Sequence, residues 1–208
     1  TNDCPVTMLT TAGLDKIALR VPAHEQAQKL LAICDMPIAA PSANLSGRIS
    51  PSTADHVYAG LAGKIDLILD GGPCENGLES TIIDCSGEAP VLLRPGGISR
   101  GAVETALHSA GLHCWLADAA ALSDRSQPVA PGQLQSHYAP DASVRRNATS
   151  QQGDEELIGF GPIPGAGELS LSLSQSGNIK EAAANLFSML HQANAVTTGT
   201  NRRIAIAP

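Results

Sequence analysis

The sequence is poor in aromatic residues, with one tryptophan, two tyrosines and two phenylalanines among 208 residues. These five are spread along the chain, so they do not form the aromatic platform on which nucleic-acid bases stack. Basic side chains are also few, because 13 lysines and arginines stand against 20 acidic residues and leave a net charge of −7. This charge disfavours broad electrostatic binding to nucleic acid, and we expect no stable direct contact with it.

Long apolar runs and paired cysteines are missing as well. No run approaches the ~20 residues of a membrane helix, and no basic-then-apolar signal pattern opens the chain, so no membrane partner is expected. The five cysteines make neither a CxxC motif nor a cluster with histidine, which argues against a zinc site and a disulfide framework. The sequence therefore predicts a reduced, cytoplasmic protein without a protein-built metal site.

Short β-like runs alternate with helical runs between residues 16 and 111, a pattern typical of a layered α/β domain. The runs that predict strands are residues 16–22, 37–41, 65–70, 80–85 and 90–94. The runs that predict helices are residues 23–35, 51–61 and 99–110, and Ser50 is the expected cap of the second.

A second α/β unit follows a stretch rich in alanine, serine, glutamine and proline, which is typical of a linker. Its expected strands are residues 156–161, 168–173 and 203–208, and its expected helix is residues 179–195. We predict three parts: an α/β domain over residues 1–116, a linker over 117–140 and a small C-terminal α/β domain over 141–208.

A polar loop from Pro41 to Ser50 leaves a predicted buried strand and enters a predicted helix. Ser42, Asn44, Ser46 and Ser50 place hydroxyls, an amide and free helix-start N–H groups on one side of the sheet, which favours an anion. Serine and asparagine are also ordinary turn and cap residues, so both interpretations stay open.

Two further motifs place polar side chains at strand ends. Ser80 and Thr81 open an otherwise apolar strand after a glycine-containing loop, at a rim where ligands gather, although ordinary strand-forming residues explain them too. Arg94 ends an apolar run just before Pro95-Gly96-Gly97, which suits a phosphate or a carboxylate. A salt bridge to a nearby acid explains Arg94, and Arg20 on its own predicted strand, equally well.

The predicted linker holds His137 and one of the two tyrosines, Tyr138, between two prolines. A pure spacer has little need of such residues. Either Tyr138 packs into a groove or the segment lies over a ligand, and the sequence does not choose between them. The remaining histidines show no partner pattern and are predicted to be surface or packing residues: His24, His56, His108, His113 and His191.

Five motifs, taken in order, resemble one family: AAPSANLSGRISPSTADHV, the DGGP turn, ESTIID, LLRPGGISR and APGQLQSHYAP. They are similar to the two-domain YrdC-type threonylcarbamoyl-AMP synthases over residues 15–140. Residues 141–208 resemble the start of that family's smaller C-terminal domain. The resemblance implies an α/β fold in which a YrdC-like twisted mixed sheet with helices is followed by the linker and a smaller Rossmann-like α/β domain.

The resemblance also implies an activity, that of a nucleotidyltransferase in tRNA processing. Such an enzyme joins L-threonine, bicarbonate and ATP, with Mg²⁺ accompanying the ATP, into L-threonylcarbamoyladenylate and pyrophosphate. A separate transferase then uses the product for the threonylcarbamoyladenosine modification of tRNA. By position in the motifs, the ATP-binding residues would be Ser42, Asn44, Ser50, Arg94, His137 and Tyr138, the last two covering the site. The threonine-binding residues would be Arg20, Ala40, Ser80 and Thr81.

The sequence departs from the family pattern at three points. A basic Lys-x-Arg segment is expected before residue 1, so we expect a fragment whose catalytic residues are unassigned and whose own turnover is in question. Leu134-Gln135-Ser136 stands where the family often has a tyrosine and basic residues. A final helix of the small domain is expected after residue 208, and without it the sheet of that domain would have an open, poorly stable edge.

Two alternatives to a synthase stay open. The first is a non-catalytic nucleotide- or RNA-binding module with a YrdC-like domain, although the net charge of −7 argues against RNA. The second is a carbamoyl-transfer maturation factor, a group that carries long additional domains and zinc-type cysteine clusters, neither of which is visible in this sequence.

Overall fold

The computed structural model describes residues 6, 8–11, 15–113, 116–118, 138–163 and 171–208. The chain divides into two compact units, Thr1–Ser42 and Ala43–Pro208. The first unit contains a 3₁₀ helix, η1 (Met8–Thr11), and one α-helix, α1 (Glu25–Cys34), which confirms the predicted helix at 23–35. α1 ends where Asp35 adopts left-handed backbone (φ 47°) and donates its N–H to the Leu31 carbonyl at 3.2 Å.

The strands predicted at 16–22 and 37–41 are wrong, because the described part of the first unit contains no strand. Leu19 and Val21 lie 83% and 94% exposed, whereas a buried strand would cover such side chains. A β-like run becomes a strand only when a neighbouring segment pairs with its backbone N–H and C=O groups. Composition alone does not tell whether that neighbour is there.

The second unit begins with the polar loop and continues into helix α2 (Ala54–Leu61). This helix starts three residues later than predicted, because Thr53 caps it by accepting the His56 N–H at 3.3 Å. Ser50, the expected cap, is buried before the helix starts. The strand predicted at 65–70 is also wrong for the described chain, where Leu67 lies 83% exposed.

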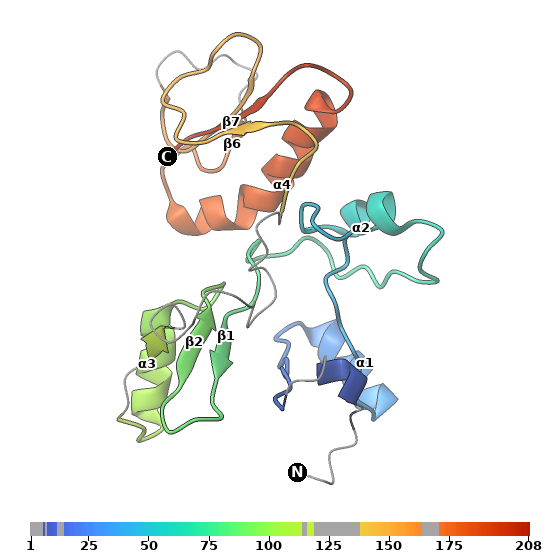
Figure 1. The fold of residues 1–208 in the computed structure, drawn as a ribbon, viewed down its shortest axis with the longest axis vertical. Helices are drawn as coiled ribbons and strands as arrows, with labels where there is room; N and C mark the ends of the chain where they lie inside the picture. The colour runs from blue at the N-terminus through green and yellow to red at the C-terminus, as the bar shows by residue number, and fades with distance from the viewer. Residues whose placement is uncertain (1–5, 7, 12–14, 114–115, 119–137, 164–170) are drawn as a thin grey trace. The chain divides into compact units, whose positions relative to one another are not determined.

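A three-stranded mixed sheet follows, with the order β1 (Ile82–Asp84), β2 (Val91–Arg94) and β3 (Ala117–Asp118). β1 and β2 lie within the runs predicted as strands and form an antiparallel pair, and β3 runs parallel to β2. Helix α3 (Arg100–Ser109) starts at the predicted cap Ser99, whose hydroxyl accepts the Ala102 N–H at 3.3 Å. Val103 of α3 packs on Leu92 of β2, and the helix lies along this sheet (Figure 1).

The C-terminal part of the second unit is a four-stranded parallel sheet. Its strand order is β4 (Val144–Arg145), β7 (Ile204–Ile206), β5 (Glu156–Gly159) and β6 (Leu171–Ser172). Three of these strands were predicted, and the two-residue β4 was not. β7, the last strand of the chain, pairs on both sides and lies inside this sheet.

Helix α4 (Ile179–Thr197) packs on this parallel sheet and gives the unit its largest core (Figure 1). Asn178 caps the helix by accepting the N–H groups of Lys180 and Glu181 at 2.9 and 3.1 Å. Phe187, Leu190 and Ala193 of α4 meet the strand residues Ile158 and Ile204, all of which are buried. Tyr138, at the end of the predicted linker, also packs against this core.

Gly77 brings the loop between α2 and β1 directly against the backbone of α4. A side chain at this position has no room, since a Cβ would lie 2.2 Å from the Ala184 carbonyl oxygen and 2.5 Å from that of Ala183. The backbone at Gly77 is also left-handed (φ 51°), a conformation that L-residues disfavour. Both constraints fix glycine at this contact.

We expect Gly77→Ala to lower the free energy of unfolding by at least about 2 kcal/mol, because overpacking adds to the cost of the left-handed backbone. Gly72→Ala is the matched control, since Gly72 is also left-handed (φ 84°) but a Cβ there would meet nothing within 4 Å. Urea unfolding followed by circular dichroism measures both. Equal losses in the two variants would show that the contact with α4 contributes nothing.

Candidate functional site

A hydrogen-bonded group of polar residues lies where the polar loop, the start of β1 and the end of β2 meet. We call Ser50, Glu79, Ser80, Arg94 and Tyr138 the Glu79 network. The Ser50 hydroxyl donates to Glu79 Oε1 at 3.1 Å, and the Arg94 guanidinium forms an ion pair with Glu79 Oε2. Arg94 also donates from Nη2 to the Ser80 carbonyl at 2.9 Å and to the Ser80 hydroxyl at 3.1 Å.

The antiparallel pairing of β1 and β2 sets this arrangement. Arg94 is the pairing partner of Ile82, so its side chain lies beside the residues that lead into β1, and its Nε reaches the Ser80 carbonyl at 3.1 Å. A shift in the register between Ile82 and Ile83 marks an irregularity at this end of the pair. Such bulges re-aim side chains near functional sites.

The Pro-Gly-Gly turn after Arg94 packs tightly on the same segment. A Cβ at Gly96 would lie 2.3 Å from the Glu79 carbonyl oxygen, so only glycine fits. Gly97 donates its N–H to that same carbonyl at 2.9 Å. The Thr81 hydroxyl donates to the Ile98 carbonyl at 2.6 Å and accepts the Ile98 N–H at 3.0 Å. Thr81 therefore holds the turn in place beside the network.

The polar loop reaches the network through Ser50, which is 7% exposed. Earlier in the loop, Asn44 donates from Nδ2 to the carbonyls of Leu45 and Arg48 at 2.9 and 3.1 Å. Its Oδ1 is buried and has no hydrogen-bond partner among the described residues. A buried, unsatisfied amide oxygen is costly, so this atom suits a ligand donor.

Tyr138 connects the end of the linker to the network. Its ring lies 5.2 Å from that of Phe187 on α4, and its hydroxyl donates a hydrogen bond to the Glu79 carboxylate. Burial, followed by the hydrogen bond and the negative charge of Glu79, raises the pKa of Tyr138 to about 12. The left-handed backbone at Tyr138 (φ 58°) is unfavourable for an aromatic residue and is held by these contacts.

Ala139 and Asp141, which follow Tyr138 in the chain, also contact the polar loop. Ala139 donates its N–H to the Gly47 carbonyl at 3.0 Å, and Asp141 forms an ion pair with Arg48. Asn194 of α4 meets Asp141 from the other side, accepting the Asp141 N–H at 2.7 Å. Tyr138 thus packs against the core of α4 and the parallel sheet, which is one of the two possibilities that the sequence left open, and a role over a ligand stays a prediction.

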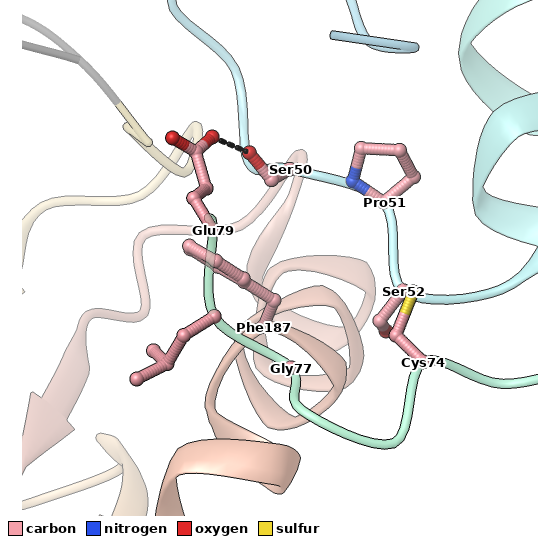
Figure 2. A pocket seen from close by; sticks show the side chains of 8 residues that line it. Ser50, Pro51, Ser52, Cys74, Gly77, Glu79 and Phe187 are labelled. Carbon is pink, nitrogen blue, oxygen red and sulfur yellow. Dashed lines mark hydrogen bonds between the residues drawn. The ribbon is translucent and has the colours of Figure 1, made fainter. Parts of the chain in front are cut away.

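A small cavity of about 60 Å³ borders the network (Figure 2). It is lined by Ser50, Pro51, Ser52, Cys74, Gly77, Leu78, Glu79 and Phe187. Figure 2 shows the Glu79 and Ser50 side chains turned toward each other. The volume is well below the roughly 300–1,000 Å³ of small-molecule pockets, so the cavity alone does not hold a nucleotide.

Two histidines with no recognisable sequence pattern stack beside the polar loop. The rings of His56 on α2 and His191 on α4 lie 3.8 Å apart at an interplanar angle of 19°. His191 Nε2 donates to the Ser50 carbonyl at 3.1 Å, and His56 Nδ1 accepts the Ser52 N–H at 3.3 Å. The two histidines lie 135 positions apart in the sequence, so no local pattern predicts that they pair, and the expectation that they are packing residues is confirmed.

Of the predicted ATP-binding residues, the structure brings Ser50, Arg94 and Tyr138 together in the network, and Asn44 lies on the same loop as Ser50. Of the predicted threonine-binding residues, Ser80 belongs to the network and Thr81 follows it. Three others lie in the first unit and are exposed: Arg20, Ala40 and Ser42. His137 lies outside the described residues. The binding roles of all of these stay predictions.

Glu79 is the network residue that the sequence did not single out. A carboxylate beside a predicted anion site looks unfavourable by charge alone, so the motif directs attention to Ser80 and Thr81 instead. The useful signal was the plainer interpretation of Arg94, a salt bridge to a nearby acid, which the ion pair with Glu79 confirms.

The described residues contain no group of three or more histidine, cysteine, aspartate or glutamate side chains that would hold a metal ion. The carboxylate nearest to the predicted ATP residues, Glu79, is already occupied by Ser50, Arg94 and Tyr138. Mg²⁺ is commonly held by substrate phosphates with only one or two protein carboxylates, so an ion that accompanies ATP stays a prediction. Within the same described portion, no helix is both long and apolar enough to cross a membrane.

The mixed sheet with α3 and the parallel sheet with α4 define an α/β protein, and family profiles divide it into two domains. The profile described as "Telomere recombination" (Sua5/YciO/YrdC) matches residues 2–96, and the profile "Threonylcarbamoyl-AMP synthase, C-terminal domain" matches residues 98–207. The chain therefore belongs to the two-domain Sua5/YrdC family. The predicted family and fold class are confirmed, whereas the predicted boundaries at 116 and 140 stay predictions.

Named relatives and solved structures point the same way. The chain is 45% identical over 148 residues to the threonylcarbamoyl-AMP synthase of Bacillus subtilis, covering 71% of this chain and 41% of that protein. It is 45% identical over 141 residues to the Pyrococcus abyssi enzyme, covering 67% and 40%. The crystal structure of P. abyssi Sua5 complexed with L-threonine matches with a TM-score of 0.76 and 33% identity, covering 97% of this chain and 61% of that one. The chain thus spans about two fifths of the length of these curated relatives.

The stacked histidines predict a pH-dependent stability. Burial, with the neighbouring His191, lowers the pKa of His56 below 6.5 despite the opposing charge of Asp55, and burial lowers the pKa of His191 despite its bond to Ser50. The unfolded chain therefore binds more protons as the pH falls through 6.5. We expect the free energy of unfolding to be highest above about pH 7 and to fall as the pH drops toward the lowered values.

Urea unfolding from about pH 8 to pH 5 tests this expectation. The double variant His56→Asn, His191→Gln keeps an acceptor for Ser52 and a donor for Ser50 but no longer titrates, so its stability should fall less over this range. His108→Gln, at an exposed position on α3, is the control. The same pH slope in the double variant and the parent would exclude the histidine pair as the cause.

Proposed function

We propose that this chain carries the substrate-binding network of an L-threonylcarbamoyladenylate synthase. The reaction class is nucleotidyl transfer, with L-threonine, bicarbonate and ATP as substrates. The single observation that carries the proposal is the Glu79 network, which joins three separate motifs of the sequence around the Arg94 guanidinium. The names of the relatives and the threonine complex of P. abyssi Sua5 support the choice of substrates.

The chemistry suits these residue types. The amine of threonine combines with bicarbonate to give a carbamate and water, and a carbamate oxygen then attacks the α-phosphorus of ATP and expels pyrophosphate. Such a transfer depends mainly on alignment and on neutralisation of phosphate charge. Arg94 supplies a fixed positive charge for the phosphates, while the unsatisfied Asn44 Oδ1 can accept a hydrogen bond from a hydroxyl or amino group of the ligand.

Mg²⁺ would accompany the ATP phosphates and add charge neutralisation. Ser80 and Thr81 at the start of β1, with Arg20 and Ala40 of the first unit, are the proposed threonine side of the site. Because a carbamate and a mixed anhydride both hydrolyse readily, the proposed site needs a cover that excludes water. His137 and Tyr138 are proposed for that role, and the docked ring of Tyr138 supports it.

The product would pass to a separate enzyme that modifies tRNA, so this chain needs no stable contact with nucleic acid. We propose a cytoplasmic, reducing location, supported by the free thiols of the described cysteines Cys34, Cys74 and Cys85.

Threonine-dependent pyrophosphate release tests the function. The assay compares this chain with a chimera in which the Bacillus subtilis relative supplies the parts of its own sequence that lie outside the match, with ATP, Mg²⁺, bicarbonate and threonine present. Release that requires threonine supports the synthase. ATP binding without threonine dependence in either protein would support the non-catalytic nucleotide-binding module instead.

Arg94→Lys should lower kcat/KM for ATP by about tenfold to a hundredfold, since lysine keeps the charge but loses the several directed hydrogen bonds of the guanidinium, at about 1.5–3 kcal/mol for charged bonds. Steady-state kinetics with the pyrophosphate assay measures the change. Arg146→Ala removes an arginine from an exposed position and is the control. Parent-like kinetics for Arg94→Lys would remove Arg94 from the proposed ATP site.

A further inference from the structure

The Glu79 carboxylate accepts from three side chains that come from three separate segments. Ser50 reaches it from the polar loop, Arg94 from the end of β2 and Tyr138 from the end of the linker. The Glu79 and Arg94 side chains are only 22% and 14% exposed, so both are largely removed from water. A partly buried carboxylate with three donors is well satisfied.

The negative charge of Glu79 argues against a direct contact with the nucleotide. A carboxylate beside a phosphate site opposes phosphate binding through its own charge, so direct contact with the nucleotide is an unfavourable role for Glu79. Its geometry serves another purpose. The ion pair and the two Arg94 bonds to Ser80 hold one guanidinium from both ends, which removes its freedom to rotate before a ligand arrives. A side chain fixed in advance loses less entropy when it binds.

We propose that Glu79 is a positioning residue of the synthase reaction, which aligns Arg94 for the phosphates of ATP and fixes Ser50 and Tyr138 at the same point. The proposal rests on the proposed function. It assigns Glu79 no contact with substrate. Glu79 acts through Arg94, Ser50 and Tyr138, so changing it should matter only while those partners are present.

Two substitutions of Glu79 distinguish the effect of its negative charge from the effect of its side-chain length. Glu79→Gln keeps the length of the side chain but loses the charge, and Glu79→Asp keeps the charge but is too short to bridge the three donors. In the protein that passes the pyrophosphate assay, each should lower kcat/KM for ATP by about tenfold to a hundredfold, the range for losing a charge-assisted hydrogen bond. Glu75→Gln, an exposed glutamate of the same loop, is the matched control and should stay within about twofold.

A double-mutant cycle distinguishes positioning from a general structural role. In an Arg94→Ala background, Glu79→Gln should cost at most about threefold more, because Arg94, the charged partner through which Glu79 mainly acts, is gone. Losses that multiply in full would overturn the proposal. Thermal unfolding accompanies each variant, and Glu79→Asp carries the test if Glu79→Gln does not fold.

Tyr138 supplies a readout that does not depend on turnover. Only Tyr58 and Tyr138 are tyrosines, so in a Tyr58→Phe background the tyrosinate absorbance reports Tyr138 alone. Glu79→Gln should lower the pKa of Tyr138 from about 12 toward its ordinary value of 10. An unchanged titration would overturn the contact on which the proposal depends. Absence of threonine-dependent release in the parent protein would instead overturn the proposed function, so the two failures are distinguishable.

Discussion

The ion pair between Glu79 and Arg94 is the interaction on which the arrangement of the site depends. One partner leads into β1 and the other ends β2, so the pair closes the open end of the antiparallel hairpin. Ser50 and Tyr138 add to it from segments distant in sequence. Removing either charge would leave the other largely buried and unpaired, which costs more than the pair itself contributes. A change at either residue of the pair is therefore expected to disturb the whole network.

The motifs predicted much of this site because polar residues at strand ends and loop–helix junctions have few structural uses. Ser50, Ser80 and Arg94 were found in this way, and the structure places them within hydrogen-bond distance of one another or of Glu79. Glu79 and the stacked His56 and His191 were not found. Their roles arise from neighbours that only the folded chain brings together, and local patterns carry no trace of such neighbours.

The sequence predicts a helix or strand correctly where its local pattern matches the hydrogen bonding of the folded backbone. The hairpin of β1 and β2, helix α3 with its Ser99 cap, and helix α4 all match the expected positions. The runs at 16–22, 37–41 and 65–70 have the composition of strands but form no strand in the described chain, and several of their apolar side chains are exposed. A strand is a property of two segments, whereas a helix satisfies its own backbone, which explains why the helices were predicted better.

The contact at Gly77 bears on how freely the parts of this family can be recombined. The loop that carries Glu79 touches main-chain oxygens of α4, so no exchange of side chains on the helix can make room for a larger residue in the loop. A hybrid that joins the N-terminal portion of one relative to the C-terminal portion of another must therefore keep the path of this helix as well as its sequence. The position of α4 on the C-terminal sheet therefore limits the conformation of the loop that carries Gly77 and Glu79.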